Sequence, residues 1–170
     1  IGVPSFFVTM TRQAMSIQPT GCGTSLNKDY ALERALLECL QPLHLYNEHL
    51  AKNQEHILHH FAATPLLAQC AKVDLTPLQD QYHYIDFNLL PSKPMTETVT
   101  AQLDTIIQKI HSQGFTIYSL EIAATDSGFH CVKYIIPQFE QFYLVEIGKF
   151  VLPNLRGMAL IEQSLKRSLH

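Results

Sequence analysis

The stretch 21–41 (GCGTSLNKDYALERALLECLQ) constrains the fold more than any other part of the chain. Asn27 is a good N-cap residue, and Asp29 follows in the first turn, where a carboxylate suits the helix dipole. Apolar residues then recur at helical spacing and form one arc: Ala31, Leu32, Ala35, Leu36, Cys39 and Leu40. The stretch therefore predicts a helix over 28–41 that packs on this arc.

Four polar side chains form one narrow stripe on the same helix, opposite the apolar arc. At about 100° per residue, positions i, i+7, i+11 and i+14 stack in a row: Asn27, Arg34, Glu38 and Gln41. A guanidinium, a carboxylate and an amide in one row have the chemistry to hold a cation and a phosphate chain together. A solvated helix face explains the same spacing, so spacing alone leaves both interpretations open.

The residues themselves resemble the ATP-binding helix of the YcaO family, in which a small-residue turn precedes an Ala-x-x-Arg-Ala-x-x-Glu-x-x-Gln pattern. That pattern stands here without a gap, as Ala31, Arg34, Ala35, Glu38 and Gln41. A second stretch, 115–140, looks like the family's strand, short turn and strand that end in a Val/Ile-x-x-Pro segment. The resemblance is specific at 21–41, looser at 115–140 and weak between 45 and 95.

The second stretch departs from the family's pattern at three positions. Lys133 stands where the family often has an arginine, and Gln138 and Phe139 replace a more usual Gly-Leu. Lysine keeps the charge of arginine but loses its bidentate fork. No specific role is therefore carried over to these three residues, and ordinary strand-end structure explains the last two.

The resemblance implies a site for ATP and Mg²⁺. Glu38 would contact the Mg²⁺ ion that bridges the nucleotide phosphates, and Gln41 would be a neighbouring ligand. Arg34 would face phosphate or hold Glu38 in place. Ser25 and Asn27 would bond nucleotide or metal-bound water, although capping explains them as well. No catalytic side chain is assigned.

The resemblance also implies a reaction. YcaO enzymes use ATP to phosphorylate a peptide-bond oxygen, after which a thiol, hydroxyl, amine or external sulfide adds to the carbon. The implied function is ATP- and Mg²⁺-dependent activation of a peptide backbone amide, leading to azoline, thioamide or amidine formation. Cyclodehydratases, makers of thiazole/oxazole-modified microcins and thioamidation enzymes all fit. Two alternatives stay open: a non-catalytic YcaO-like binding or scaffold module, and an unrelated α+β domain that binds small molecules.

The resemblance further implies a peptide or protein substrate and a partner protein that presents it; a homodimer stays open. The chain begins with Ile1, and the family's two upstream acidic motifs have no convincing counterpart here. We therefore expect residues 1–170 to be part of a single YcaO-like domain whose upstream portion is missing. We expect this piece alone to be inactive.

Composition narrows the function classes. A net charge of −3 offers no basic surface for nucleic acid, and no run approaches the ~20 apolar residues of a membrane span. The four cysteines lack C-x-x-C spacing, which favours reduced thiols and a cytoplasmic location. Five histidines gather in one stretch, where we expect exposed helix positions without metal: His44, His49, His56, His59 and His60.

The remaining patterns predict an α+β fold with helices packed on a largely antiparallel or mixed sheet. The expected turns are 19–25 and 125–128. The expected strands are 2–10, 15–18, 84–90, 115–123, 129–136 and 142–147, and the further helices are 43–61, 65–71, 96–113 (capped by Thr96) and 155–168. We also expect one shared core in which Val99, Leu103, Ile106 and Ile110 are buried together with Leu32, Leu36 or Leu40.

Overall fold

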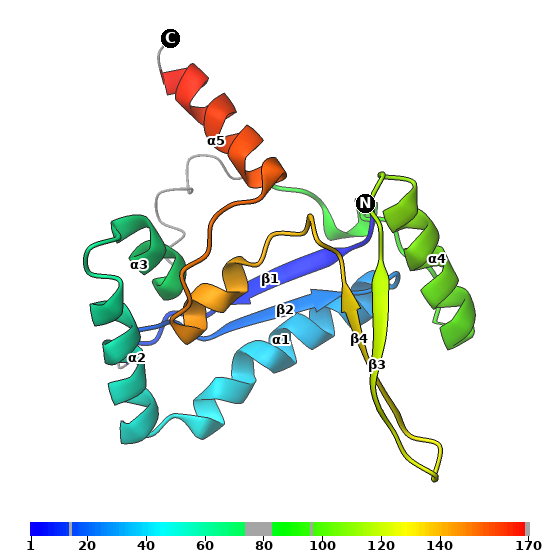
Figure 1. Ribbon diagram of the computed structural model, residues 1–170, viewed down its shortest axis with the longest axis horizontal. Coiled ribbons are helices and arrows are strands. Elements are labelled where there is room, and N and C mark those ends of the chain that lie inside the picture. The colour runs from blue at the N-terminus through cyan, green and yellow to red at the C-terminus, as the bar shows by residue number, and fades with distance from the viewer. Residues whose placement is uncertain (14, 74–82, 96, 169–170) are drawn as a thin grey trace. The chain divides into compact units, whose positions relative to one another are not determined.

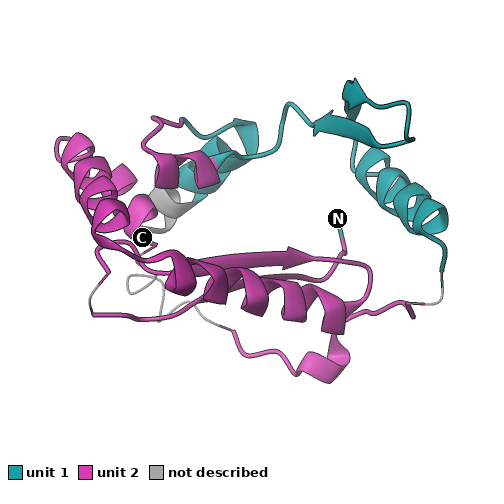
Figure 2. Cartoon of the chain, turned by 90° about the horizontal axis from the view of Figure 1, so that it is seen from below, with its two compact units in different colours: residues 1, 97–141, 152–170 teal, residues 2–96, 142–151 magenta. Residues whose placement is uncertain are grey.

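The computed structural model describes residues 1–13, 15–73, 83–95 and 97–168, with side chains to residue 163. The chain divides into two compact units (Figure 2). Unit 1 comprises residues 1, 97–141 and 152–170, and unit 2 comprises residues 2–96 and 142–151. The described residues form helices and two small antiparallel sheets, which confirms the predicted α+β class.

Unit 2 is built on a hairpin of β1 (Ser5–Thr9) and β2 (Thr20–Thr24), which pair antiparallel. Helix α1 (Lys28–Leu45) lies along both strands (Figure 1). The predicted partner strand over 15–18 is wrong, because the strand that pairs with β1 begins at Thr20.

The two glycines of β2 explain this difference. They read as turn residues in the sequence, yet both lie in the strand and neither has a positive φ. A Cβ on Gly23 would overlap the Ala31 carbonyl oxygen and lie 2.7 Å from the Ala35 nitrogen. A Cβ on Gly21 would likewise overlap the Ala35 carbonyl oxygen. The glycines therefore let the helix backbone lie directly on the strand.

The buried side of α1 is narrower than the predicted arc. Ala31, Ala35 and Cys39 are at most 1% exposed, whereas Leu36 and Leu40 are 46% and 40% exposed. At 100° per residue the buried line is turned by about 50° from the centre of the predicted arc. The stripe with Arg34 and Glu38 consequently lies beside β2, not opposite the packed face. The expected shared core is wrong, since Leu36, Leu40 and, in unit 1, Val99 (83%) are exposed.

The second half of unit 2 has its own core. Helix α1 continues through Pro42 to Leu45, and Asn47 then caps α2 (Glu48–His60), so the chain breaks four residues later than expected. Helix α3 (Pro65–Lys72) follows, close to its predicted bounds. The core side chains are Ile17, Ile57, Phe61, Ala71 and Val145. Buried Gln54 bonds both backbone groups of Ile17 and so fixes the β1–β2 connection.

Two predicted strands of this unit are short 3-10 helices instead. Within residues 84–90 only Phe87–Leu89 are regular, as η2, whose N-cap is Asp86. Residues 142–147 form η3 (Phe142–Ile147), which packs against α3. Neither segment finds a strand partner among the described residues, and η3 instead buries Val145 completely.

Unit 1 holds the remaining elements. Helix α4 (Val99–His111) is capped by Thr98; the predicted cap, Thr96, lies outside the described residues. Strands β3 (Tyr118–Ala124) and β4 (His130–Ile135) form the predicted second hairpin, and Gly128 at its turn has φ +83°. Helix α5 (Leu155–Ser168) begins against Glu140, whose carboxylate accepts the N–H groups of Asn154 and Gly157.

Candidate functional site

The five predicted site residues fall into two groups, three on α1 and two just before it. Arg34, Glu38 and Gln41 are exposed along the stripe beside β2. Ser25 and Asn27 are half-buried where β2 leads into the helix. Because α1 is one continuous helix, the three exposed side chains are presented in a row, as the sequence predicted.

Ser25 and Asn27 are engaged by the protein itself. The Asn27 side chain accepts the Tyr30 N–H at 2.9 Å and donates to the Lys93 carbonyl at 3.0 Å. Its backbone N–H donates to the Ser25 hydroxyl at 3.2 Å. These contacts cap the helix and fasten residue 93 to it, so capping accounts for both residues.

The first turn of α1 is occupied in the same way. The Lys28 backbone N–H donates to the Ser92 hydroxyl at 3.1 Å. The Lys28 ammonium donates to the Phe87 and Asn88 carbonyls and lies 4.8 Å from the centre of the Phe87 ring. These contacts with residues 87–92 take up donors that a free helix N-terminus would offer to an anion.

Glu38 is fixed against the strand. Its Oε2 accepts the backbone N–H of Cys22 at 3.3 Å. The Arg34 guanidinium lies instead over the Tyr30 ring, 6.0 Å from its centre, and within the described residues it forms no ion pair with Glu38. Arg34 therefore keeps an uncompensated positive charge one turn before the carboxylate.

The charge of Glu38 acts on a second carboxylate, that of Glu146, which no motif in the sequence singles out. Burial and, to a lesser degree, the charge of Glu38 raise the pKa of half-buried Glu146. Burial, Glu38 and Glu146 together raise the pKa of the Cys22 thiol. Glu146 is held by η3, through its neighbour Val145 in the core. Its sequence signal is a single charge inside the apolar run 142–147.

The donor set suits a hard cation. Mg²⁺ is commonly bound by one or two carboxylates together with phosphate oxygens and water. Glu38 is one such carboxylate, and its charge acts on a second, that of Glu146. The Cys22 thiol is a soft ligand, and its raised pKa keeps it protonated. No group of three or more His, Cys, Asp or Glu side chains suited to a metal occurs in the described part of the chain. Nucleotide phosphates would have to complete such a site.

The structure also places the histidines, the cysteines and Lys133 that the sequence singled out. The five histidines of the 44–60 stretch are exposed, and all four cysteines are free thiols. Lys133 is exposed in β4, opposite Leu120. Among the described helices, none has the length and apolar character needed to cross a membrane.

Comparison with protein families identifies the chain. A sequence model described as YcaO cyclodehydratase, ATP- and Mg²⁺-binding, matches residues 1–140. The chain belongs to the YcaO family. This confirms the resemblance seen in 21–41 and 115–140, and it makes ATP- and Mg²⁺-dependent peptide modification the function class at the level of the family. No curated protein and no solved structure matches significantly. The family match includes Arg34 and Glu38 but ends before Glu146.

Proposed function

We propose that this chain contributes an ATP- and Mg²⁺-binding face to an enzyme that activates a peptide backbone amide by phosphorylation. The observation that carries the proposal is the Glu38 carboxylate, which accepts the Cys22 N–H one helical turn after Arg34, within the stretch that the family model matches. Azoline, thioamide and amidine formation are the three outcomes considered, since each begins with an activated amide oxygen.

Each group has a distinct task in this proposal. Glu38 and Glu146 would hold Mg²⁺, and Gln41 would contact the ion or its water from the next turn of α1. Arg34 would bind a phosphate oxygen, since no carboxylate among the described residues pairs with it. When bound, Mg-ATP supplies the phosphoryl group and the charge neutralisation that such transfers need. The β2 backbone keeps Glu38 in one orientation, which limits reorganisation during transfer.

The partners follow from this chemistry. A peptide or protein substrate would be presented by a partner protein, in the cytoplasm. The second candidate function is a non-catalytic binding or scaffold module. It is favoured by the donor set, because the described residues bring only two carboxylates to the site.

Replacing Glu38 tests the proposal in the full natural protein. Glu38→Gln keeps the shape of the side chain but removes the charge from the metal site, so ATP consumption should fall about 100-fold or more. Its free energy of unfolding should change by less than about 0.5 kcal/mol.

The matched control is Glu33→Gln. Glu33 is also exposed on α1 but lies on another face of the helix, so this variant should retain the parental rate of ATP consumption. Equal, near-parental rates for both variants would reject the assignment of Glu38 and leave the scaffold function as the better proposal.

A further inference from the structure

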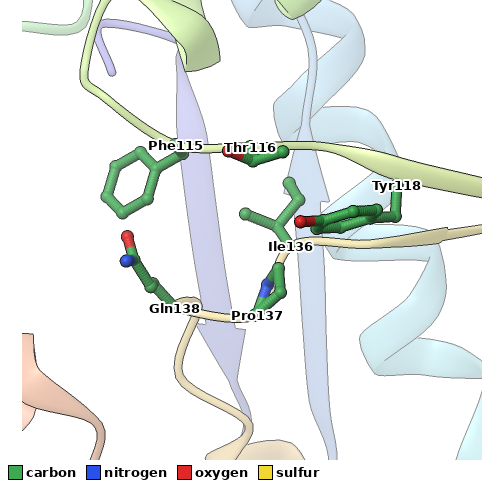
Figure 3. A pocket seen from close by; sticks show the side chains of 6 residues that line it. All are labelled: Phe115, Thr116, Tyr118, Ile136, Pro137 and Gln138. Carbon is green, nitrogen blue, oxygen red and sulfur yellow. The ribbon is translucent and has the colours of Figure 1, made fainter.

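The hollow at the open end of the β3–β4 hairpin does not select a ligand. Figure 3 shows its six lining side chains, which come from residues 115–118 and 136–138. Four of these residues are exposed: Thr116, Tyr118, Pro137 and Gln138. A molecule in the hollow would remain largely in water, so burial would stabilise it little. The hollow therefore gives no indication of what binds there.

Tyr30 is a large side chain of α1 that the packing of the helix does not use. The helix lies on β2 with Ala31, Ala35 and Cys39, which are at most 1% exposed, whereas Tyr30 is 40% exposed. The Tyr30 backbone N–H donates to the capping side chain of Asn27, so the start of the helix is held in place. The phenol ring is therefore presented on the surface from a fixed backbone.

Tyr30 lies on the same face of α1 as Arg34 and Glu38, one helical turn before Arg34. The three residues are four positions apart, so at about 100° per residue they lie within about 80° of one another. Each follows the last by about 6 Å along the helix axis. Helical side chains lean toward the N-terminus, and the Arg34 guanidinium accordingly lies 6.0 Å from the centre of the Tyr30 ring. An aromatic ring, a positive charge and a carboxylate thus follow one another along one face.

This order matches the order of groups in a nucleoside triphosphate. With Mg²⁺ at Glu38 and a phosphate oxygen at Arg34, the nucleoside would extend along α1 in one of two directions. Toward the N-terminus it would meet the Tyr30 ring, and an aromatic ring binds a nucleobase by stacking on its π-face. Toward the C-terminus the stripe ends at Gln41, whose amide is not aromatic. The side chains of α1 therefore favour a base that lies at Tyr30.

The contact between Arg34 and Tyr30 does not prevent this use of the ring. A cation is attracted to an aromatic face within about 6 Å, so the distance of 6.0 Å lies at the outer limit of the interaction, which is weak at exposed sites. A phosphate would offer Arg34 charge-assisted hydrogen bonds, which are stronger. Arg34 can therefore turn toward a phosphate and leave the ring face to a base.

We propose that Tyr30 is the platform on which the base of the nucleotide stacks. The inference rests on the proposed function, because it extends the site of Arg34 and Glu38 from the phosphates and the cation to the base. Stacking needs only the aromatic face and does not depend on the identity of the base. Tyr30 therefore adds affinity for the nucleoside part of the ligand, and its hydroxyl group is not required.

Two ligands separate the base from the phosphates: Mg-ATP and Mg-tripolyphosphate, each titrated by calorimetry into the full natural protein. Tyr30→Ala removes the ring and should weaken Mg-ATP binding about 5-fold or more, whereas binding of Mg-tripolyphosphate should change by less than about 2-fold. Tyr30→Phe and Tyr30→Trp keep an aromatic face, so both should bind Mg-ATP at least about half as tightly as the parent. Unchanged Mg-ATP affinity in Tyr30→Ala, or an equal loss for both ligands, would overturn the inference.

Two further variants serve as controls, and circular dichroism checks that each variant is folded. Leu36 is similarly exposed on α1 (46%) but lies about 120° from Tyr30 around the helix, so Leu36→Ala should bind both ligands within about 2-fold of the parent. Glu38→Gln acts on the cation and should weaken both ligands. If Glu38→Gln weakens both and Tyr30→Ala weakens neither, the platform is refuted while the Glu38 assignment stands. If Glu38→Gln weakens neither, the proposed function is refuted together with this inference.

Discussion

Replacing Gly23 with alanine tests how closely α1 lies on β2. The added Cβ would stand 2.7 Å from the Ala35 nitrogen, against at least 3.4 Å for an ordinary contact, and it would overlap the Ala31 carbonyl oxygen. Both are backbone atoms, so no side-chain rotation can relieve the overlap. The helix would have to move away from the strand.

The loss in the free energy of unfolding depends on which buried groups this movement exposes. Ala31, Ala35 and Cys39 are at most 1% exposed, and exposing such small groups costs about 0.8 kcal/mol for each carbon. Strain from overpacking adds about 1–3 kcal/mol. Alanine also lowers the conformational entropy of the unfolded chain, which stabilises the folded state by up to about 1 kcal/mol. The packing penalty is larger, and we expect a net loss of about 2–4 kcal/mol in the free energy of unfolding.

Urea denaturation followed by circular dichroism measures this loss. The midpoint should fall while the slope of the transition stays the same, since the surface exposed on unfolding barely changes. Cys22→Ala is the control: it changes the neighbouring strand residue, whose side chain is exposed, and should shift stability by less than about 0.5 kcal/mol. A Gly23→Ala chain as stable as this control would refute the close approach of helix and strand.

Three further predictions concern charge and metal. Because burial and Glu38 raise the pKa of Glu146 above its ordinary 4.5, its contribution to stability is full below that value and is lost as pH rises through the raised pKa. In thermal scans, Glu146→Gln should therefore exceed the parent in midpoint near pH ~7 but not near pH ~4; the same difference at both would contradict this. A chelator should leave the midpoint unchanged, and a fall above about 10 °C would show that His56, His59 or His60 holds a structural metal. Calorimetry of Mg-ATP with this chain should not reach low micromolar affinity, about −8 kcal/mol, because two carboxylates leave the ion with few protein ligands; reaching it would show a complete site.

Local signals in the sequence were sufficient for much of this structure. Asn27 and Pro65 mark helix starts, and Gly128 marks the turn of the β3–β4 hairpin; these elements lie within a few residues of their predicted bounds. The row of Arg34, Glu38 and Gln41 was also predictable, since it depends only on helical spacing. The family was recognisable for the same reason, because its pattern lies within this one helix.

Properties set by tertiary contact were not predictable. Glycine suits both a turn and a close approach of backbones, and only the packing of α1 on β2 decides between them. The exposure of Leu36 and Leu40 follows from the same packing, which uses the smallest side chains of the helix. Glu146 follows Val145, which anchors η3 in the core, and no spacing in the sequence records that the charge of Glu38 acts on it.

The two ends of the α1 stripe differ in how far along the chain their contacts reach. Glu38 bonds to a strand residue 16 positions away, whereas Asn27 and Lys28 bond to residues 66 and 64 positions away. Closing the longer loops costs more chain entropy and slows their formation. During folding, we therefore expect the Glu38 end of α1 to assemble first, with the β1–β2 hairpin. The contacts of Asn27 and Lys28 with residues 92 and 93 should form later.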